Sequence, residues 1–116
     1  MDGELRRNDE ATAVEMLPGI VRRQLTEGQA TMLVELRMAA GSHVPSHTHP
    51  HEQTGYLASG RFRFRLGDRW RELSTGDSWS VPGGVEHEVE VLEDCIAIDV
   101  FSPPRDEYRD PARSSG

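Results

Sequence analysis

At 116 residues the chain is long enough for one domain with a small core, and its net charge of −7 argues against nucleic acid or an anionic membrane as a general partner. All 13 basic residues are arginines, which excludes chemistry that needs a lysine, such as a Schiff base. A single cysteine excludes an intrachain disulfide, and neither a signal peptide nor an apolar run of about 18 residues is present, so we expect a cytoplasmic protein outside the membrane.

Turn signals recur along the chain about 8 to 12 residues apart, and no helical period of useful length lies between them. They include Pro18-Gly19, Glu27-Gly28, Gly41-Ser42, Gly67-Asp68 and Pro82-Gly83-Gly84. This spacing is typical of an antiparallel β sandwich or barrel. We therefore expect one all-β domain over residues 11–109, with disordered polar tails at residues 1–10 and 110–116.

Alternating apolar residues mark the strands, because side chains in a strand point to its two faces in turn. Residues 31–39 place four apolar side chains on one face. Residues 61–66 place Phe62, Phe64 and Leu66 on one face and three arginines on the other, and Gly67-Asp68 favours a tight hairpin after them. We interpret the arginine face as solvated and balanced by glutamates; an anion-lined cavity or a dimer surface is the alternative.

Two more strands are expected late in the chain, at residues 88–92 and 95–101, with Cys95 as a small core residue. Asp99 is the one acid within the second of these apolar strands, and by alternation it shares a face with Phe101. A buried unpaired carboxylate is costly. Asp99 therefore has either a partner, such as the backbone at a strand end, or a chemical role.

The sequence SHTHPHEQ carries three of the five histidines at alternate positions. His47 and His49 lie two residues apart, so a strand would point both imidazoles to one side, and Gln53 follows in phase. One strand cannot surround an ion, and His87, just after the turn at residues 82–84, is the candidate for the next ligand. This pattern indicates a metal site; a histidine-rich surface loop is the alternative.

The polar neighbours of this run have less defined roles. His51 is in phase, but Pro50 intervenes, so His51 contacts a ligand residue, a substrate or only solvent. Glu52 is out of phase and is expected to point away from the site. His43 precedes the run and is expected in a loop.

The two histidine segments resemble the motifs of the cupins, with every spacing kept. The first motif corresponds to Gly41, His47, His49, Gln53 and Gly60, and the second to Gly76, Pro82, Gly84 and His87. The resemblance implies a double-stranded β-helix, the cupin or jelly-roll barrel, of six to eight strands. It also implies one divalent transition metal inside the barrel (nickel, iron, zinc or manganese), held by His47, His49, Gln53 and His87.

The sequence departs from the cupin pattern at two positions. Gln53 stands where a glutamate ligand is usual, and Val91 stands where the second motif usually ends in asparagine. A neutral amide with three neutral imidazoles leaves the charge of a divalent ion uncompensated, which makes it a stronger Lewis acid and favours an anionic ligand. The set also lacks the carboxylate of the two-histidine-one-carboxylate triad of iron oxygenases, so oxygen chemistry is less favoured.

Three further segments, HPHEQ-x-GY, GDSW-x-VPGGVEHEVE and DVFSPPR, make the chain similar to the pectin-degradation cupins of the KdgF type. That resemblance implies ring opening of 4,5-unsaturated monouronates, from pectin or alginate, to 5-keto-4-deoxyuronate. It implies that Asp99 transfers a proton, that Arg105 binds the carboxylate of this small anionic sugar, and that Phe101 packs on the ring. Alternatives are another cupin isomerase, a polyketide cyclase, a dioxygenase, or a metal-containing binding protein without catalytic activity.

A homodimer is also expected. An uncovered edge strand is a liability in a small barrel. The segment Ile20 to Leu25 is apolar enough to pair with a second copy of the chain.

Overall fold

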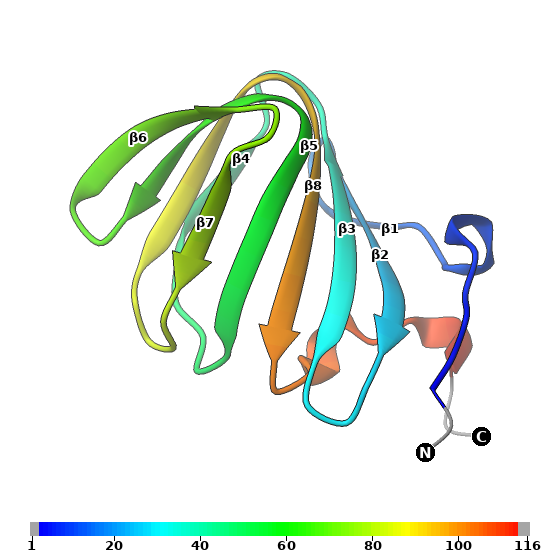
Figure 1. Cartoon of the computed structure of the whole chain (residues 1–116). Coiled ribbons are helices and arrows are strands. Elements are labelled where there is room, and N and C mark those ends of the chain that lie inside the picture. The colour runs from blue at the N-terminus through cyan, green and yellow to red at the C-terminus, as the bar shows by residue number, and fades with distance from the viewer. Residues whose placement is uncertain (1–2, 114–116) are drawn as a thin grey trace.

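The computed structural model of the chain describes residues 3–113, which form a single antiparallel β structure. The strands are β1 (Val14–Leu17), β2 (Ile20–Glu27), β3 (Met32–Met38), β4 (His43–His47), β5 (Glu52–Leu66), β6 (Arg69–Ser74), β7 (Ser78–Val81) and β8 (His87–Ser102). Short 3-10 turns lie at Asn8–Glu10, Asp106–Tyr108 and Pro111–Arg113. The expected all-β, single-domain jelly roll is confirmed (Figure 1). None of the described residues forms a helix long and apolar enough to span a membrane.

The two long strands β5 and β8 pair along nearly their whole length and form the frame of the barrel. Their first and second halves have different outer neighbours: β3 and β4 pair with β8, while β6 and β7 pair with β5 (Figure 1). The pairing shifts register between Leu57 and Phe62, where both strands bend. The two late strands expected at residues 88–92 and 95–101 are therefore one strand, because the residues between them, Glu93 and Asp94, lie at this bend and do not end the pairing.

The apolar face of each strand points into the barrel, as its alternation predicts. The core residues include Ile20, Met38, Leu57, Phe62, Phe64, Val81, Val89, Val91, Cys95 and Ala97. The arginines of residues 61–66 point outward and pair with glutamates: Arg61 with Glu72 and Glu93, and Arg63 with Glu90. The solvated, glutamate-balanced face is confirmed, although exposed ion pairs of this kind stabilise the fold by little.

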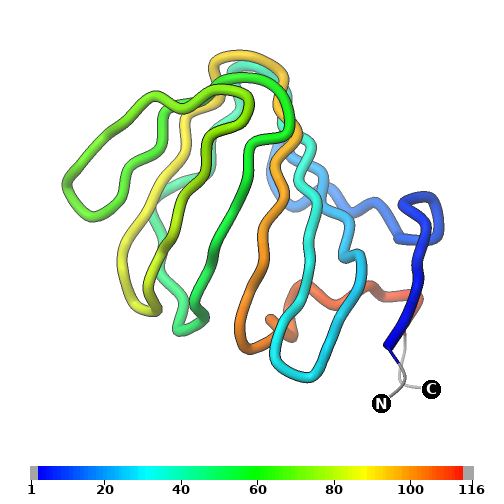
Figure 2. The backbone as a smooth tube through the Cα atoms, in the orientation of Figure 1, coloured from blue at the N-terminus to red at the C-terminus, as the bar shows by residue number. Residues whose placement is uncertain are grey.

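The two ends of the described chain lie near each other (Figure 2), and both contact β2: Arg6 and Arg113 donate to the Leu25 carbonyl, and the Asp110 amide donates to Gln24. The disordered tails at residues 1–10 and 110–116 stay a prediction. Asp110, 4% exposed, accepts hydrogen bonds from Arg6 Nη2 (2.5 Å), the Thr12 amide (2.8 Å) and the Ala112 amide (2.8 Å). Its own amide donates to Gln24 Oε1 at 2.8 Å. Asp110 lies in a polar segment of the sequence, so the composition did not predict that its carboxylate would be buried. The other residues of the expected tails, 1–2 and 114–116, lie outside the described residues.

Replacement of Asp110 by alanine should lower the free energy of unfolding by roughly 1–3 kcal/mol, because it leaves buried amides without an acceptor. Burial raises the pKa of Asp110, but the hydrogen bonds outweigh it and hold the pKa at about 2, below its ordinary value of 3.8. The stabilisation is therefore complete above 3.8 and is lost as the pH falls toward 2. Urea unfolding at neutral and acid pH should show the difference between wild type and variant shrinking on acidification. Asp106→Ala, at an 85% exposed side chain, is the control and should change little.

The segment proposed to pair two copies of the chain is already paired within it, since Ile20 to Leu25 lies in β2, which has β1 on one side and β3 on the other. Among the described strands, β1, β4, β6 and β7 each pair with a single neighbour and form the edges of the sheet. The homodimer stays a prediction, with these edges as the candidate surfaces. Light scattering at micromolar concentration should give twice the 13.0 kDa chain mass, and a monomer mass would contradict it.

Candidate metal centre

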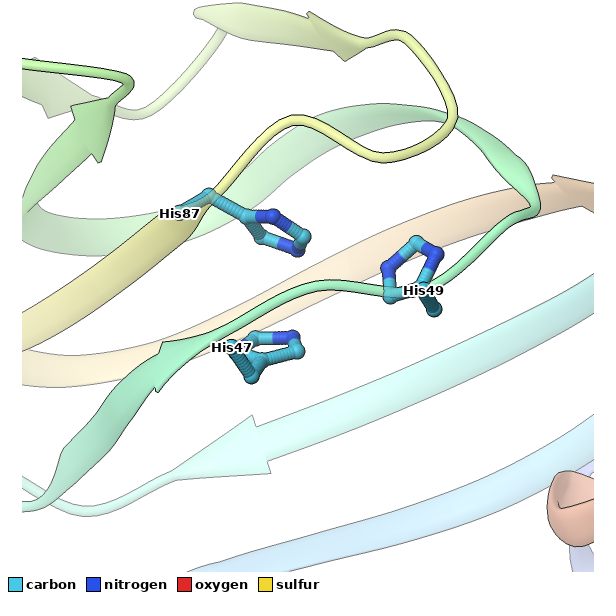
Figure 3. A group of neighbouring side chains, drawn as sticks. All are labelled: His47, His49 and His87. Atoms are coloured by element: carbon cyan, nitrogen blue, oxygen red, sulfur yellow. The ribbon is translucent and has the colours of Figure 1, made fainter.

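Three histidines from distant parts of the sequence meet inside the barrel (Figure 3). His47 ends β4 and His87 begins β8, and the two residues are direct partners in the β4–β8 pairing, with ring centroids 4.1 Å apart. His49 reaches them from the loop at residues 48–51, with its ring centroid 5.0 Å from that of His87. One nitrogen from each of the three rings lies within 4.8 Å of the other two.

The position of His49 depends on the close contact of two loops. The amide of Gly84 donates to the carbonyl of His49 at 2.9 Å. A Cβ at Gly83 would lie 2.3 Å from the carbonyl oxygen of Pro50, so only glycine allows the turn at residues 82–84 to approach this loop. The turn therefore places His49 and His87 beside one another.

Backbone carbonyls orient all three imidazoles in the same way. The Nδ1 atoms of His47, His49 and His87 lie 2.9, 3.0 and 2.9 Å from the carbonyl oxygens of Pro45, His51 and Val85, respectively. A carbonyl only accepts, so each Nδ1 carries a proton and each Nε2 of a neutral ring presents a lone pair. Burial lowers the pKa of His87 to about 4 and also lowers the pKa of His49, which keeps both rings neutral.

Gln53, at the start of β5, completes the set with its amide oxygen. Its Nε2 donates to Asp99 Oδ1 at 3.0 Å, which leaves Oε1 only 3.1 Å from His49 Nε2. Both of these atoms are acceptors when the His49 proton is on Nδ1. Two acceptors that face each other without a proton between them are unfavourable, and a cation bound to both would account for this contact.

The residues present therefore fit a divalent metal ion. The Nε2 atom of His87 is buried and has no hydrogen-bonding partner among residues 3–113. A buried acceptor without a donor is unfavourable, and coordination of a metal would satisfy it. The ligands would be His47, His49, Gln53 and His87, the same four residues that the spacing of the two motifs predicts.

Asp99 lies on β8, diagonally across from Gln53 on the paired strand β5, and its side chain is buried. Its Oδ1 accepts from Gln53 Nε2 and from Trp79 Nε1, at 3.0 and 2.9 Å. The expected alternative of a bond to the backbone is wrong, because among the described residues its carboxylate bonds only to these two side chains. Burial raises the pKa of Asp99 to about 6, against the lowering effect of both hydrogen bonds and of Arg105.

Trp79 was not predicted as a site residue, although it lies in the GDSW-x-VPGG segment. A Cβ at Gly55 would lie 2.0 Å from the Trp79 ring, so the glycine gives the indole room to cross the backbone of β5 and reach Asp99. Trp79 lies two residues before Val81, so strand alternation places both side chains on the inward face. In the sequence this position indicates only an ordinary core residue.

Arg105 and Phe101 lie in the wall of the same chamber, together with the unpredicted Tyr108. Arg105 Nε donates to Glu107 Oε1 at 2.7 Å, and its Cζ lies 5.0 Å from the Phe101 ring centroid and 3.9 Å from that of Tyr108. Phe101 is 1% exposed and packs edge-on against His49. Phe101 therefore packs against the His49 imidazole and the Arg105 guanidinium, in addition to lining the chamber.

The remaining polar neighbours lie outside the cluster of three histidines. His43 is on the outer side of β4 and not in a loop, with Nε2 2.6 Å from Glu88 Oε2. His51 supplies the carbonyl that orients His49, and its own Nδ1 is buried without a hydrogen-bonding partner in the described part of the chain. Glu52 is exposed and points away, as its phase predicts.

The chamber around the histidines has a free volume of about 40 Å³. One water needs about 10–15 Å³ by this measure, so the chamber holds an ion and a few water-sized groups. Six of the seven predicted site residues line it: His47, Gln53, His87, Asp99, Phe101 and Arg105.

These features define an all-β barrel protein with a three-histidine metal centre inside the barrel. The cupin domain family matches residues 34–101, and the chain belongs to that family. No curated protein matches the sequence.

Solved structures add closer similarities. KdgF from a Halomonas species is 33% identical, with 92% of this chain and 99% of that chain covered and a TM-score of 0.87. An RmlC-like cupin from Shewanella frigidimarina is 26% identical over 94% of this chain and all of that one, with a TM-score of 0.86. A variant of oxalate decarboxylase from Bacillus subtilis, 19% identical over 89% of this chain and 30% of its own, shares the fold with a TM-score of 0.79.

Protein purified without added metal should contain close to one equivalent of a divalent metal, and His87→Ala should lose most of it. The variant removes one of four donors and the one whose buried Nε2 has no other partner. Elemental analysis measures the content. His43→Ala, which removes an exposed histidine on the outer side of β4, is the matched control. Equal metal content in wild type and His87→Ala would contradict the site.

Proposed function

We propose that this cupin is a metal-dependent enzyme that opens the ring of 4,5-unsaturated monouronates to give 5-keto-4-deoxyuronate. The observation that carries the proposal is the buried Asp99 carboxylate, held by Gln53 and Trp79 immediately behind the three histidines. Support comes from the similarity to KdgF of Halomonas over nearly the whole of both chains. The cytoplasmic location stays a prediction.

The proton balance of this reaction suits a single carboxyl group. The substrate is a cyclic hemiacetal with an alkene between C4 and C5. Asp99 takes the proton of the C1 hydroxyl, the bond between C1 and the ring oxygen breaks, and C1 becomes an aldehyde. The electron pair passes to the ring oxygen, and the resulting enolate becomes a ketone at C5 when Asp99 returns the proton to C4. The reaction is an isomerisation, so no further reactant is needed.

A divalent ion held by His47, His49, Gln53 and His87 would supply a Lewis acid that stabilises negative charge on an adjacent oxygen. The chain's own residues hold the substrate. Arg105 presents its Nη groups, because its Nε is already bound to Glu107, and a planar guanidinium suits a carboxylate. The Phe101 and Tyr108 rings fix the plane of that guanidinium, which orients the substrate carboxylate.

Asp99→Asn should lower turnover about a hundredfold or more, the usual scale for a general acid–base group, because the amide keeps the shape but cannot carry the proton. Loss of the ultraviolet absorbance of the conjugated alkene in lyase-generated monouronates measures the rate. Metal content and melting temperature should stay near those of the wild type.

Trp79→Phe tests position separately from proton transfer, because it removes the indole donor and leaves the carboxyl group. Its loss of turnover should be smaller than that of Asp99→Asn.

Full activity of Asp99→Asn together with a large drop in melting temperature would make Asp99 a structural residue and remove the main support for this reaction. A protein that binds metal but converts no unsaturated uronate would favour another cupin activity or a binding protein.

A further inference from the structure

A second hollow lies directly outside the metal chamber. It has a free volume of about 400 Å³, ten times that of the chamber at about 40 Å³. The two share five wall residues: Met16, Val44, His47, Arg105 and Tyr108. We call this outer hollow the mouth groove. Since the chamber holds only a few water-sized groups, most of a sugar-sized ligand must lie in the mouth groove while its reacting end reaches the histidines.

The mouth groove contains an arginine whose charge is not compensated. Among the residues that the structure describes, four arginines have no carboxylate oxygen within 4.0 Å: Arg7, Arg22, Arg69 and Arg71. Arg7, Arg69 and Arg71 are exposed, whereas Arg22 is half-buried and lines the mouth groove. A chain with a net charge of −7 and many ion pairs thus keeps one free guanidinium beside the route to its metal centre.

Arg22 and Arg105 are linked through one aromatic ring. The Cζ of Arg22 lies 5.1 Å from the Tyr108 ring centroid, and that of Arg105 lies 3.9 Å from it. Glu107 distinguishes the two arginines. Its carboxylate pairs with Arg105 at 2.7 Å, whereas Arg22 Nη2 donates only to its backbone carbonyl, at 3.2 Å. The net positive charge of the mouth groove therefore belongs to Arg22.

We propose that the mouth groove is a binding site for small sugar acids and that Arg22 is its anion-binding residue. The carboxylate of an incoming uronate pairs with Arg22 in the mouth groove before it reaches Arg105 in the wall shared with the chamber. Arg22 is thus a positioning and specificity residue that discriminates acidic sugars from neutral ones. This inference rests on the proposed function for the class of ligand only, and not for the reaction.

Calorimetric titration of the metal-loaded protein with D-galacturonate and with D-galactose tests the site without any turnover. Arg22→Gln should weaken galacturonate binding about tenfold, because it removes a charge-assisted hydrogen bond. It should leave galactose binding unchanged. Arg71→Gln is the matched control, since it removes the same charge from an exposed, unpaired arginine on β6, and it should bind galacturonate as the wild type does. Arg22→Lys should retain part of the affinity, and added salt should narrow the difference between wild type and Arg22→Gln.

Unchanged galacturonate affinity in Arg22→Gln, an equal loss in Arg71→Gln, or no galacturonate binding by the wild type at millimolar concentration would each overturn the inference. If the melting temperature of Arg22→Gln is far below that of the wild type, the comparison uses Arg22→Lys instead. Its galacturonate affinity must then be measurable but lower than that of the wild type. Wild-type protein that binds galacturonate through Arg22 but converts no unsaturated uronate would refute the proposed reaction and leave the binding site standing. Normal turnover together with unchanged binding in Arg22→Gln would refute the binding site alone.

Discussion

The side-chain amide of Gln53 is the interaction on which the rest of the site depends. Its oxygen faces the imidazole nitrogens and its NH2 group donates to Asp99, so one group joins the metal centre to the candidate proton carrier. A glutamate at this position would have no proton to donate to Asp99 when ionised, and two buried carboxylates would face each other at hydrogen-bonding distance, which is strongly unfavourable. The departure from the usual cupin glutamate is therefore coupled to the presence of Asp99 on the neighbouring strand.

The pairing of β5 with β8 makes that coupling possible, because it sets Gln53 opposite Phe101 and Gly55 opposite Asp99. The same pairing places Leu66 opposite His87 at the far end of the two strands. A shift by one residue would turn Asp99 to the outer face and break the contact with Gln53. The ligand rings are fixed by backbone carbonyls and not by acidic side chains, so the metal centre keeps its neutral donor set.

The parts of the structure that follow a local period were predictable from the sequence. Two-residue alternation predicted the inward faces of residues 31–39 and 61–66, and the spacing of two motifs brought His87 to His47 and His49. Features made by contacts between distant polar residues were not predictable in this way. Nothing near Asp110 in the sequence indicates its hydrogen-bonding partners, and nothing near Arg22 indicates that no carboxylate of the described residues pairs with it. Trp79 and Tyr108 read as core aromatics, since their role depends on which atoms they reach across the barrel.

The meeting of the chain ends has a topological consequence. Arg113 Nη1 lies 3.1 Å from Glu4 Oε2, so residues near the two ends of the sequence are neighbours in space (Figure 2). A barrel tied in this way behaves as a nearly closed loop, in which neither end can fray without disturbing the cluster that holds the other. Proteins with adjoining ends tolerate circular permutation. A short peptide that joins the ends, with new ends opened between β5 and β6 at the Gly67-Asp68 turn, would therefore keep every strand pairing and both walls of the mouth groove intact.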